Sequence, residues 1–245
     1  MELTSVNNDK VKLWQKLKDK KYRDIYKLFL VEGDHLVNEA LKHNIVKEII
    51  TTDTNSKYDV DTYYVNDKIM KLLSNQVTSS NVIGVCSLLE GKDIDGNILV
   101  LDNIQDPGNL GTIIRSASAF NFKNIILSND TVDVYNPKVI RATEGMIFNI
   151  NVIRTDIIDF LNNLDKKYIK ITTDVNNGED IRNIDSNNIV LVIGNEGNGV
   201  RKEVSDICDK KVYIKMNSNT ESLNAAVAGS ILMYEVNHEW LYMCW

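Results

Sequence analysis

The stretch "ILVLDNIQDPGNLGTIIRSASAF", residues 98–120, indicates the fold class of the larger part of the chain. It opens with a short apolar run, typical of a strand buried on both faces, and "DPG" at 106–108 is a strong turn signal. A helical pattern of apolar and small residues follows. A buried strand that runs through a tight turn into a helix is the repeating unit of a parallel sheet covered by helices.

Arg115 is the only charged residue in this stretch after Asp106. The positions three and four residues away on either side hold no acid: Gly111, Thr112, Ser118 and Ala119. Arg115 therefore has no ion-pair partner within its own predicted helix. A guanidinium in such a helix either reaches solvent or meets an anion from elsewhere, because burial without a partner is costly. Taken alone, an isolated helical arginine more often reaches solvent.

Strands and helices alternate from Ile98 to the end of the chain, which predicts a largely parallel sheet with helices on its faces. Asn136 followed by Pro137 is typical of a helix N-cap with proline in the first turn. The last element is a long helix expected to begin near Ser222.

The first ninety residues have a different pattern, which predicts a small α/β unit. Helical spacing occurs at Val11, Trp14 and Leu17, and again over 34–43 and 67–73, with strands near 46–52, 63–65 and 82–89. The polar stretch "EGKDIDGN", 90–97, carries two glycines and suits a linker, although a surface hairpin within one domain would look the same. We therefore expect domains at 1–90 and 97–245.

Length and composition place the 245-residue chain among ordinary globular proteins, with 43% hydrophobic and 25% charged residues. No apolar run reaches the about eighteen residues that suggest a membrane span. The polar start does not resemble a signal peptide, so we expect a cytoplasmic protein. Cys86, Cys208 and Cys244 are too widely spaced to indicate a disulfide framework or a zinc site.

The charge distribution is uneven. The net charge is −6 and the pI is about 5.2, which argues against a nucleic-acid partner. Residues 1–30 nevertheless hold eight Lys or Arg and four Asp or Glu, a local charge of +4. This basic segment is either a phosphate-binding surface or a solvated helix face.

A second segment of interest is "NNIVLVIGNEGNGVRKE", residues 187–203, a buried strand that enters a glycine-rich loop. Glycines at the carboxyl end of a strand let the backbone approach a ligand closely. The order GxxGxG, late in the chain and without an acid after the next strand, does not match the dinucleotide fingerprint. No Lys-Ser or Lys-Thr pair follows, which excludes a P-loop. Glu196 in this loop either contacts a ligand or favours the following helix N-terminus.

The third segment is "VYIKMNSNTESLNAAVAGSILMYE", residues 212–235: a strand, a polar loop and a helix rich in Ala, Gly and Ser. Small side chains allow this helix to lie close to another backbone. Ser222 is the predicted N-cap, whereas Asn224 has less reason to lie in a first helical turn.

Together, these ordered segments resemble the three motifs of the SpoU, or TrmH, family of RNA 2′-O-methyltransferases in the SPOUT superfamily. The matching positions are Asn103, Asp106, Pro107, Gly108, Asn109, Gly111 and Arg115, then "GNEGNG" at 194–199 and "ESLNAAVA" at 221–228. The resemblance covers about Ile98 to the C-terminus, and three motifs in this order are far more specific than any one of them. The late position of the glycine-rich loop and the missing acid disfavour an ordinary nucleotide-fold methyltransferase or dehydrogenase.

The resemblance implies an α/β fold with a deep trefoil knot, S-adenosylmethionine as cofactor, a homodimer and no metal. The implied catalytic residues are Arg115, Asn109, Glu196, Ser222 and Asn224. The implied cofactor-binding residues are Gly194, Ile214, Leu223, Gly199 and Met216. Family members commonly have proline after the isoleucine of the third motif; Lys215 stands there in this chain.

Residues 10–41, "KVKLWQKLKDKKYRD…FLVEGDHLVNEAL", resemble the substrate-binding domain of the ribosomal-RNA members, which is similar to a small RNA-binding ribosomal protein. This implies ribosomal RNA as partner and phosphate contacts for the basic segment. Two alternatives stay open: a transfer-RNA 2′-O-methyltransferase, and a non-catalytic RNA-binding or ribosome-assembly factor with the same fold. The sequence does not identify the target nucleotide, or a housekeeping as against an antibiotic-resistance role.

Overall fold

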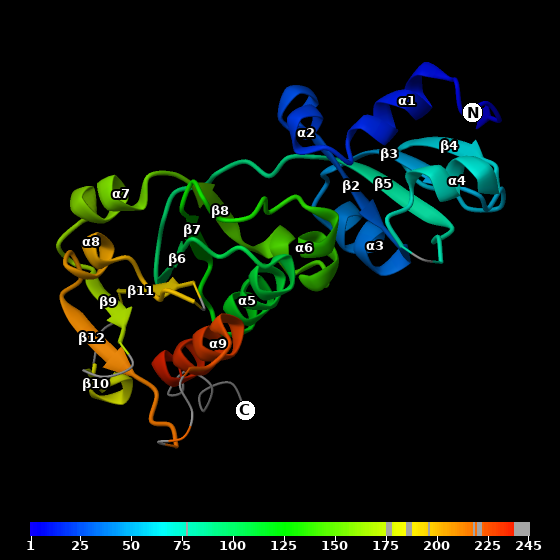
Figure 1. The fold of residues 1–245 in the computed structure, drawn as a ribbon. Helices are drawn as coiled ribbons and strands as arrows, with labels where there is room; N and C mark the ends of the chain where they lie inside the picture. Colours follow the sequence, from blue (N-terminus) through cyan, green and yellow to red (C-terminus); the bar gives the residue numbers. More distant parts are fainter. Residues whose placement is uncertain are drawn as a thin grey trace. The chain divides into compact units, whose positions relative to one another are not determined.

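The computed structural model describes residues 1–76, 78–174, 178–184, 188–195, 197–217, 219 and 222–237. Figure 1 shows the course of the chain and its elements. The contacts between residues divide the chain into two compact units. One unit is Met1–Glu90 with Asp133–Phe148, and the other is Gly91–Val132 with the residues from Asn149 onward. The chain thus visits the first unit twice, since residues 133–148 group with the N-terminal part.

The N-terminal unit contains a mixed five-stranded sheet in the order β1-β4-β3-β5-β2. Its strands are β1 (Glu2–Leu3), β2 (Leu28–Glu32), β3 (Val46–Thr51), β4 (Asp61–Val65) and β5 (Val82–Ser87). β3 pairs in parallel with β4 and antiparallel with β5, which also pairs antiparallel with β2. The predicted α/β character of this part is confirmed.

The described residues of the N-terminal unit form the α-helices α1 (Asp9–Lys16), α2 (Lys20–Tyr26), α3 (Asp34–Lys42), α4 (Asp67–Leu73) and α6 (Pro137–Ala142). Trp14 and Leu17, at the end of α1, are buried with Ile69 and Leu73 of α4 in one cluster against the sheet. The predicted helices at 34–43 and 67–73 are confirmed. Helix α2 was not predicted, because its apolar residues do not face the core.

The C-terminal unit contains a seven-stranded sheet in the order β10-β12-β9-β11-β6-β7-β8, and every pairing is parallel. Its strands are β6 (Ile98–Asp102), β7 (Asn124–Leu127), β8 (Asn151–Arg154), β9 (Ile169–Thr173), β10 (Glu179–Asp180), β11 (Ile189–Gly194) and β12 (Lys210–Tyr213). The predicted parallel sheet is confirmed. β11, which leads into the glycine-rich loop, lies centrally between β9 and β6.

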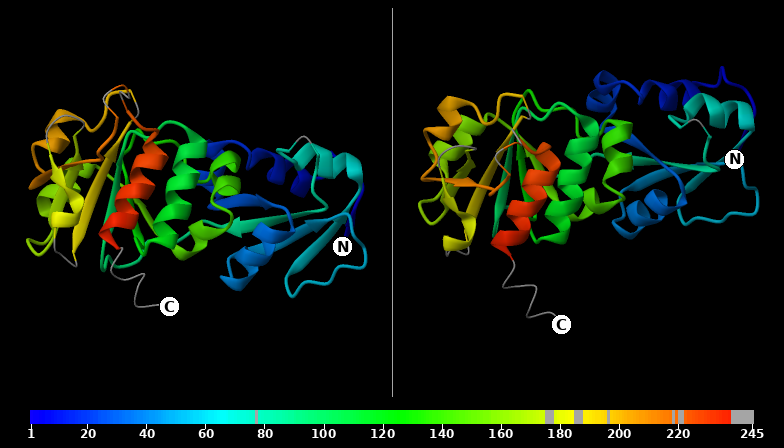
Figure 2. Two further views of the ribbon diagram at one scale, coloured as in Figure 1. Left: turned by 90° about the horizontal axis from the view of Figure 1, so that it is seen from below. Right: turned by 60° about the horizontal axis from the view of Figure 1, so that its bottom comes forward.

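Helices cover both faces of this sheet (Figure 2). α7 (Ile157–Asn163) and α8 (Lys202–Ser205) bury their apolar residues against the side chains of Val190 and Val192. Ile193 follows Val192 in β11, so its side chain lies on the other face of the sheet. On that face, α9 (Ala225–Val236) contacts Ile193 at the position of Gly229. α9 also lies beside α5 (Pro107–Ala119), joined by a 2.7 Å hydrogen bond between the hydroxyls of Ser230 and Ser116.

Side-chain caps fix where the helices begin. The Asp106 carboxylate accepts a hydrogen bond from the backbone N–H of Asn109 at 2.8 Å, with Pro107 in the first turn of α5. Asn136 caps α6 as predicted. The prediction of Ser222 as the N-cap of the last helix is wrong: α9 starts at Ala225, and Asn224 caps it by accepting from two backbone N–H groups.

Two further expectations concern membranes and cysteines. Among the described residues, none of the helices combines the length and the apolar character needed to span a bilayer. Cys86 and Cys208 are free thiols, and burial raises the pKa of the Cys208 thiol to about 11, well away from reactive thiolate chemistry. Cys244 lies outside the described residues.

Candidate functional site

The first two motifs meet at the carboxyl edge of the parallel sheet. Asp102, the last residue of β6, is the register partner of Gly194, the last residue of β11. Just beyond the strands, the side-chain amide of Asn195 donates to the backbone carbonyl of Asn103 at 3.0 Å. Because the carboxyl ends of parallel strands share one edge, two segments ninety residues apart become neighbours there, at the place where open α/β sheets bind ligands.

The glycine-rich loop turns back tightly on itself. Asn195 and Gly199 exchange two backbone hydrogen bonds, of 3.1 and 2.8 Å. A Cβ atom on Gly194 would lie 2.2 Å from the carbonyl carbon and oxygen of Gly199, and Gly199 itself has a φ of +65°. Position 194 therefore has no room for a side chain, and position 199 has the left-handed backbone that favours glycine. Glu196, a predicted catalytic residue, lies outside the described residues.

A buried carboxylate holds the end of the same loop. Asp102 is completely buried, and its two oxygens accept from the backbone N–H of Arg201 at 2.9 Å and from its Nε at 2.8 Å. A charged pair of hydrogen bonds to a buried acid is among the stronger polar contacts in a protein. This pair ties β6 to the chain that leaves the loop. The sequence analysis did not single it out, although an acid at the end of an apolar strand was a usable signal.

The third motif joins the first through two asparagines. The Nδ2 of Asn224 donates to Oδ1 of Asn109 at 3.0 Å, while Oδ1 of Asn224 caps α9. This bond links the starts of α5 and α9, the two helices that lie side by side in Figure 1. The sequence analysis gave little structural reason for Asn224. The structure supplies one, since a single side chain caps one helix and positions the other.

Arg115 is exposed on α5 and makes no hydrogen bond or ion pair with any residue that the structure describes. It follows Asn109 by six positions, so the two side chains leave the helix about 120° apart. Asn109 binds Asn224 instead of orienting the guanidinium. Among the described residues, the guanidinium donors of Arg115 are therefore free to bind an anion, and the partner of Arg115 stays a prediction.

A cavity of about 610 Å³ opens beside the glycine-rich loop and the chain that precedes α9. This volume lies within the usual range for cofactor pockets. The structure brings together, in its lining, all five residues predicted for the cofactor and one predicted catalytic residue: Gly194, Gly199, Ile214, Met216, Leu223 and Ser222. The described catalytic candidates Asn109, Arg115 and Asn224 are not among the lining residues.

Two residues that line the cavity lie outside the three segments singled out in the sequence: Thr173 and Asp174. Thr173 and Asp174 stand at the carboxyl end of β9, the neighbour of β11, and the Asp174 carboxylate lies 3.2 Å from the Lys211 ammonium. Their signal was their place directly after an apolar strand. This position identifies them as cavity residues only once β9 is known to pair with β11, and the sequence does not specify that pairing.

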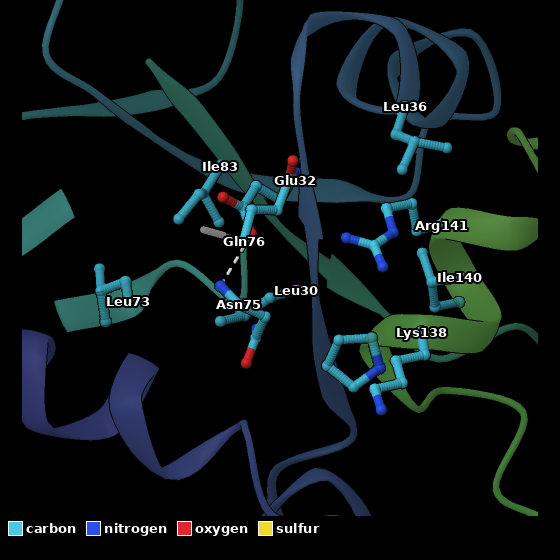
Figure 3. Close-up of a pocket in the computed structure, with 11 residues that line it drawn as sticks. Leu30, Glu32, Leu36, Leu73, Asn75, Gln76, Ile83, Lys138, Ile140 and Arg141 are labelled. Carbon is cyan, nitrogen blue, oxygen red and sulfur yellow. Dashed lines mark hydrogen bonds between the residues drawn. The ribbon is translucent and has the colours of Figure 1, made fainter. Parts of the chain in front are cut away.

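A second hollow lies in the N-terminal unit (Figure 3). In the figure, Arg141 points from α6 into the hollow that Glu32 and Gln76 line from other elements. The Glu32 carboxylate is engaged by the Ser74 hydroxyl and by the backbone N–H of Asn75 at 3.0 Å. The hollow measures about 60 Å³, which suits a few water molecules rather than a cofactor.

Comparisons with known proteins identify the family of this chain. Residues 96–234 match the model of the SpoU rRNA Methylase family, and residues 8–84 match the MRM3-like substrate binding domain. The chain is 36% identical over 244 residues, 96% of its length and 98% of the relative's, to the 23S rRNA (guanosine(2553)-2′-O)-methyltransferase RlmP of Bacillus subtilis. The chain belongs to the SpoU rRNA methylase family.

Solved structures show the same fold across both units. An rRNA methyltransferase from Sinorhizobium meliloti superposes with a TM-score of 0.88 at 29% identity, covering 98% of each chain. A structure of AdoMet bound rRNA methyltransferase from the same organism superposes with a TM-score of 0.85 at 28% identity, again over 98% of each chain.

Proposed function

We propose that this protein transfers a methyl group from S-adenosylmethionine to a ribose 2′-hydroxyl of ribosomal RNA. Membership of the SpoU family and 36% identity to RlmP along nearly the whole chain support this reaction. RlmP is named for guanosine 2553 of 23S rRNA, so the equivalent guanosine is the first candidate target. Residues 1–90 serve as the RNA substrate-binding domain, and 97–245 as the methyltransferase domain.

One observation carries the proposal: the three motifs meet in space. Asn195 in the glycine-rich loop donates to the carbonyl of Asn103 of the first motif, and Asn224 of the third motif binds Asn109 of the first. A large cavity opens where the glycine-rich loop and the third motif approach each other. A purely structural role would not need a hollow lined by the predicted cofactor residues.

The residues present fit the cofactor. Gly194 and Gly199 expose backbone groups without side chains, while Ile214, Met216 and Leu223 offer apolar surface for the adenine and the methionine chain. Ile214 lines the cavity although Lys215, and not proline, follows it. The sulfonium methyl of the bound cofactor is already activated, so the reaction requires no metal.

Arg115 acts on the substrate as a fixed positive charge. A guanidinium keeps its proton throughout the ordinary pH range, which makes it a poor general base. With no partner among the described residues, it binds the phosphate beside the target ribose and stabilises negative charge that develops on the 2′-oxygen. It thereby lowers the cost of losing the hydroxyl proton to solvent water while the ribose is held for in-line attack.

The other predicted catalytic residues position the site. Asn109 and Asn224 hold the starts of α5 and α9 together, and so fix α5, which carries Arg115. Ser222 lines the cavity and orients the ribose or its phosphate. Glu196 orders the glycine-rich loop against the third motif, a role that rests on the family resemblance.

The chain path supports a deep trefoil knot in the C-terminal unit. After β12, the chain does not continue along the sheet edge but returns to place α9 against Ile193 of β11 and beside α5. In the family that this chain resembles, a C-terminal segment threaded through a loop makes the knot, an exception to the rule that chains avoid threading. The crowding explains the small residues in the first turns of α9.

The outer face of α9 supports a homodimer. Val227, Ile231 and Tyr234 follow one another at helical spacing and are 46%, 36% and 44% exposed. A row of large apolar side chains on a helix with a single charged residue marks a protein contact surface. A second copy of this chain, presenting the same row, covers it with the symmetry of a twofold interface.

Two measurements test the proposed reaction. Calorimetry with S-adenosylmethionine should show binding; absence of binding, with and without RNA, would favour the non-catalytic assembly factor. Mass spectrometric mapping of ribose methylation, in cells with and without the gene, should show one site lost from 23S rRNA. A site lost from transfer RNA instead would establish the alternative substrate.

A further inference from the structure

Helix α2 buries a charged side chain and exposes apolar ones, the reverse of the usual arrangement in a surface helix. Its only buried residue is Arg23, 4% exposed, whereas Ile25 and Tyr26 are 59% and 41% exposed. A surface helix ordinarily turns its apolar residues inward and its charges outward. The exposed isoleucine and tyrosine contribute little hydrophobic stabilisation while they lie in water. The outward face of α2 therefore has the character of a binding surface.

The buried arginine fixes the direction in which α2 presents its outer face. Arg23 donates to the carbonyls of Leu17 and Lys18 at 2.8 and 2.7 Å, and pairs with the Asp133 carboxylate at 2.5 Å. These contacts lie within the N-terminal unit. Because a buried ion pair tolerates little movement, the exposed residues of α2 are held on a stable platform.

Aromatic rings and cations gather on this outer face. The rings of Tyr22 and Tyr26 lie nearly parallel, 20° apart, with centroids separated by 6.4 Å. The ammonium groups of Lys16 and Lys21 lie 5.3 and 5.8 Å from the Tyr22 ring, and neither pairs with an acid among the described residues. We call Lys16, Lys21, Tyr22, Ile25 and Tyr26 the α2 platform.

We propose that the α2 platform binds single-stranded RNA, with bases stacked on Tyr22 and Tyr26 beside Ile25 and phosphates held by Lys16 and Lys21. This inference rests on the proposed function, and assigns the place where an unpaired segment of the RNA substrate docks. Aromatic side chains beside lysines are the general means of holding unstacked bases without reading their sequence.

Charge identifies the occupant as RNA. A protein partner would have to desolvate the two lysines to cover the rings, at a cost that only matching acids offset. An RNA strand carries a phosphate beside every base, so its bases can stack on the tyrosine rings while its phosphates bind the lysine ammonium groups. The platform also lies in the segment of +4 charge within a chain whose net charge is −6.

The test uses the full-length protein saturated with S-adenosylmethionine and an unstructured ribo-oligonucleotide that carries 2-aminopurine. We expect Y22A/Y26A to raise the RNA Kd roughly tenfold or more and to abolish the fluorescence quenching that stacking causes. Tyr26→Phe keeps the ring and should bind within about twofold of the wild type. Tyr58→Ala, in a loop of the same unit, is the matched control for loss of a tyrosine.

The outcomes separate this inference from the proposed reaction. Unchanged oligonucleotide affinity and quenching in Y22A/Y26A, with methylation of ribosomal RNA intact, would overturn the platform and leave the reaction standing. The same unchanged values with weaker binding to ribosomal particles would point to a protein occupant and also overturn it. Absence of cofactor binding in the wild type would contradict the reaction, whereas the stacking signal on Tyr22 and Tyr26 would still support the platform.

Discussion

Helices α2 and α9 both show large apolar side chains to solvent, yet their surroundings differ. α9 has twelve residues and one charge, Glu235, whereas the seven residues of α2 include Lys20, Lys21, Arg23 and Asp24. The residues beside the exposed apolar side chains of α9 are mainly small ones, such as Ala228 and Ser230, together with the partly exposed Glu235. Those beside the exposed apolar side chains of α2 are the bases Lys20 and Lys21 and the acid Asp24, which pairs with Lys20.

The contrast teaches that exposed apolar area indicates a partner, while the neighbouring charges indicate its chemistry. An apolar row with few charges beside it can be covered by a copy of itself at little desolvation cost, because few polar groups lose their water. A row flanked by lysines repels its own copy and attracts a polyanion. α9 therefore suits a homodimer, and α2 suits RNA.

The largest expected effect comes from placing an acid on each helix in turn. Ile231→Asp should raise the dimer Kd at least roughly 100-fold, because each of two copies loses about 1.5–3 kcal/mol of apolar burial. Ile25→Asp should leave the dimer intact and weaken RNA binding through repulsion of phosphates. Analytical ultracentrifugation and RNA-binding titrations measure both. If Ile25→Asp produced monomers, the assignment of partners to the two helices would be wrong.

Arg115→Lys should lower kcat by a factor on the order of 10² to 10³ and leave cofactor affinity unchanged. Lysine keeps the charge but lacks the planar fork that binds a phosphate or alkoxide through two parallel hydrogen bonds. Single-turnover methylation assays and calorimetry separate the two quantities. Retention of most of the turnover would rule out a shape-specific role and leave Arg115 as a simple surface charge.

Gly194→Ala should weaken S-adenosylmethionine binding roughly 10- to 100-fold without changing the affinity of the α2 platform for RNA. The added Cβ would overlap the Gly199 backbone, and overpacking of this kind costs about 1–3 kcal/mol. Gly91→Ala is the matched control, since its Cβ would meet only Ile153 at an ordinary 3.9 Å. Equal affinities of the two variants for S-adenosylmethionine would show that the glycine-rich loop does not form the cofactor pocket.

Asn224→Ala should give the smallest effect, a loss of about 0.5–2 kcal/mol in the free energy of unfolding together with several-fold lower kcat. The cap of α9 and the bond to Asn109 disappear together. Asn224→Ser keeps the capping oxygen but not the reach to Asn109, so it should restore stability and not turnover. Urea unfolding and methylation rates measure the two effects. Full recovery of turnover in the serine variant would limit Asn224 to capping.

The sequence predicted those elements of the fold whose apolar residues face the core. Residues 34–43 and 67–73 show helical spacing because each helix buries one side, and the apolar strands from Ile98 indicate a parallel sheet for the same reason. Helix α2 escaped prediction because its apolar residues point outward. The spacing of apolar residues indicates which side of an element is buried in the chain's own core. The apolar residues of α2 lie outside that core, on the proposed RNA-binding surface.

For the candidate site, residue types were predictable and contacts were not. Gly194 and Arg115 stood out as a glycine at the end of a strand and as a charge without a local partner. The clamp between Asp102 and Arg201 could not be predicted, since it joins residues that become neighbours only when β11 lies beside β6. The pairing of Asn109 with Asn224 depends in the same way on α5 and α9 lying side by side.

By itself, the sequence determined that the chain has two differently patterned parts, a parallel sheet and a glycine-rich loop. These features follow from local preferences, which every residue carries into any fold. The tertiary structure alone decided that residues 133–148 group with the N-terminal unit, that Asn224 and not Ser222 caps the last helix, and that α2 turns its tyrosines outward. Each of these depends on strand order and on which side of an element is buried, and those are properties of contacts between distant parts of the chain.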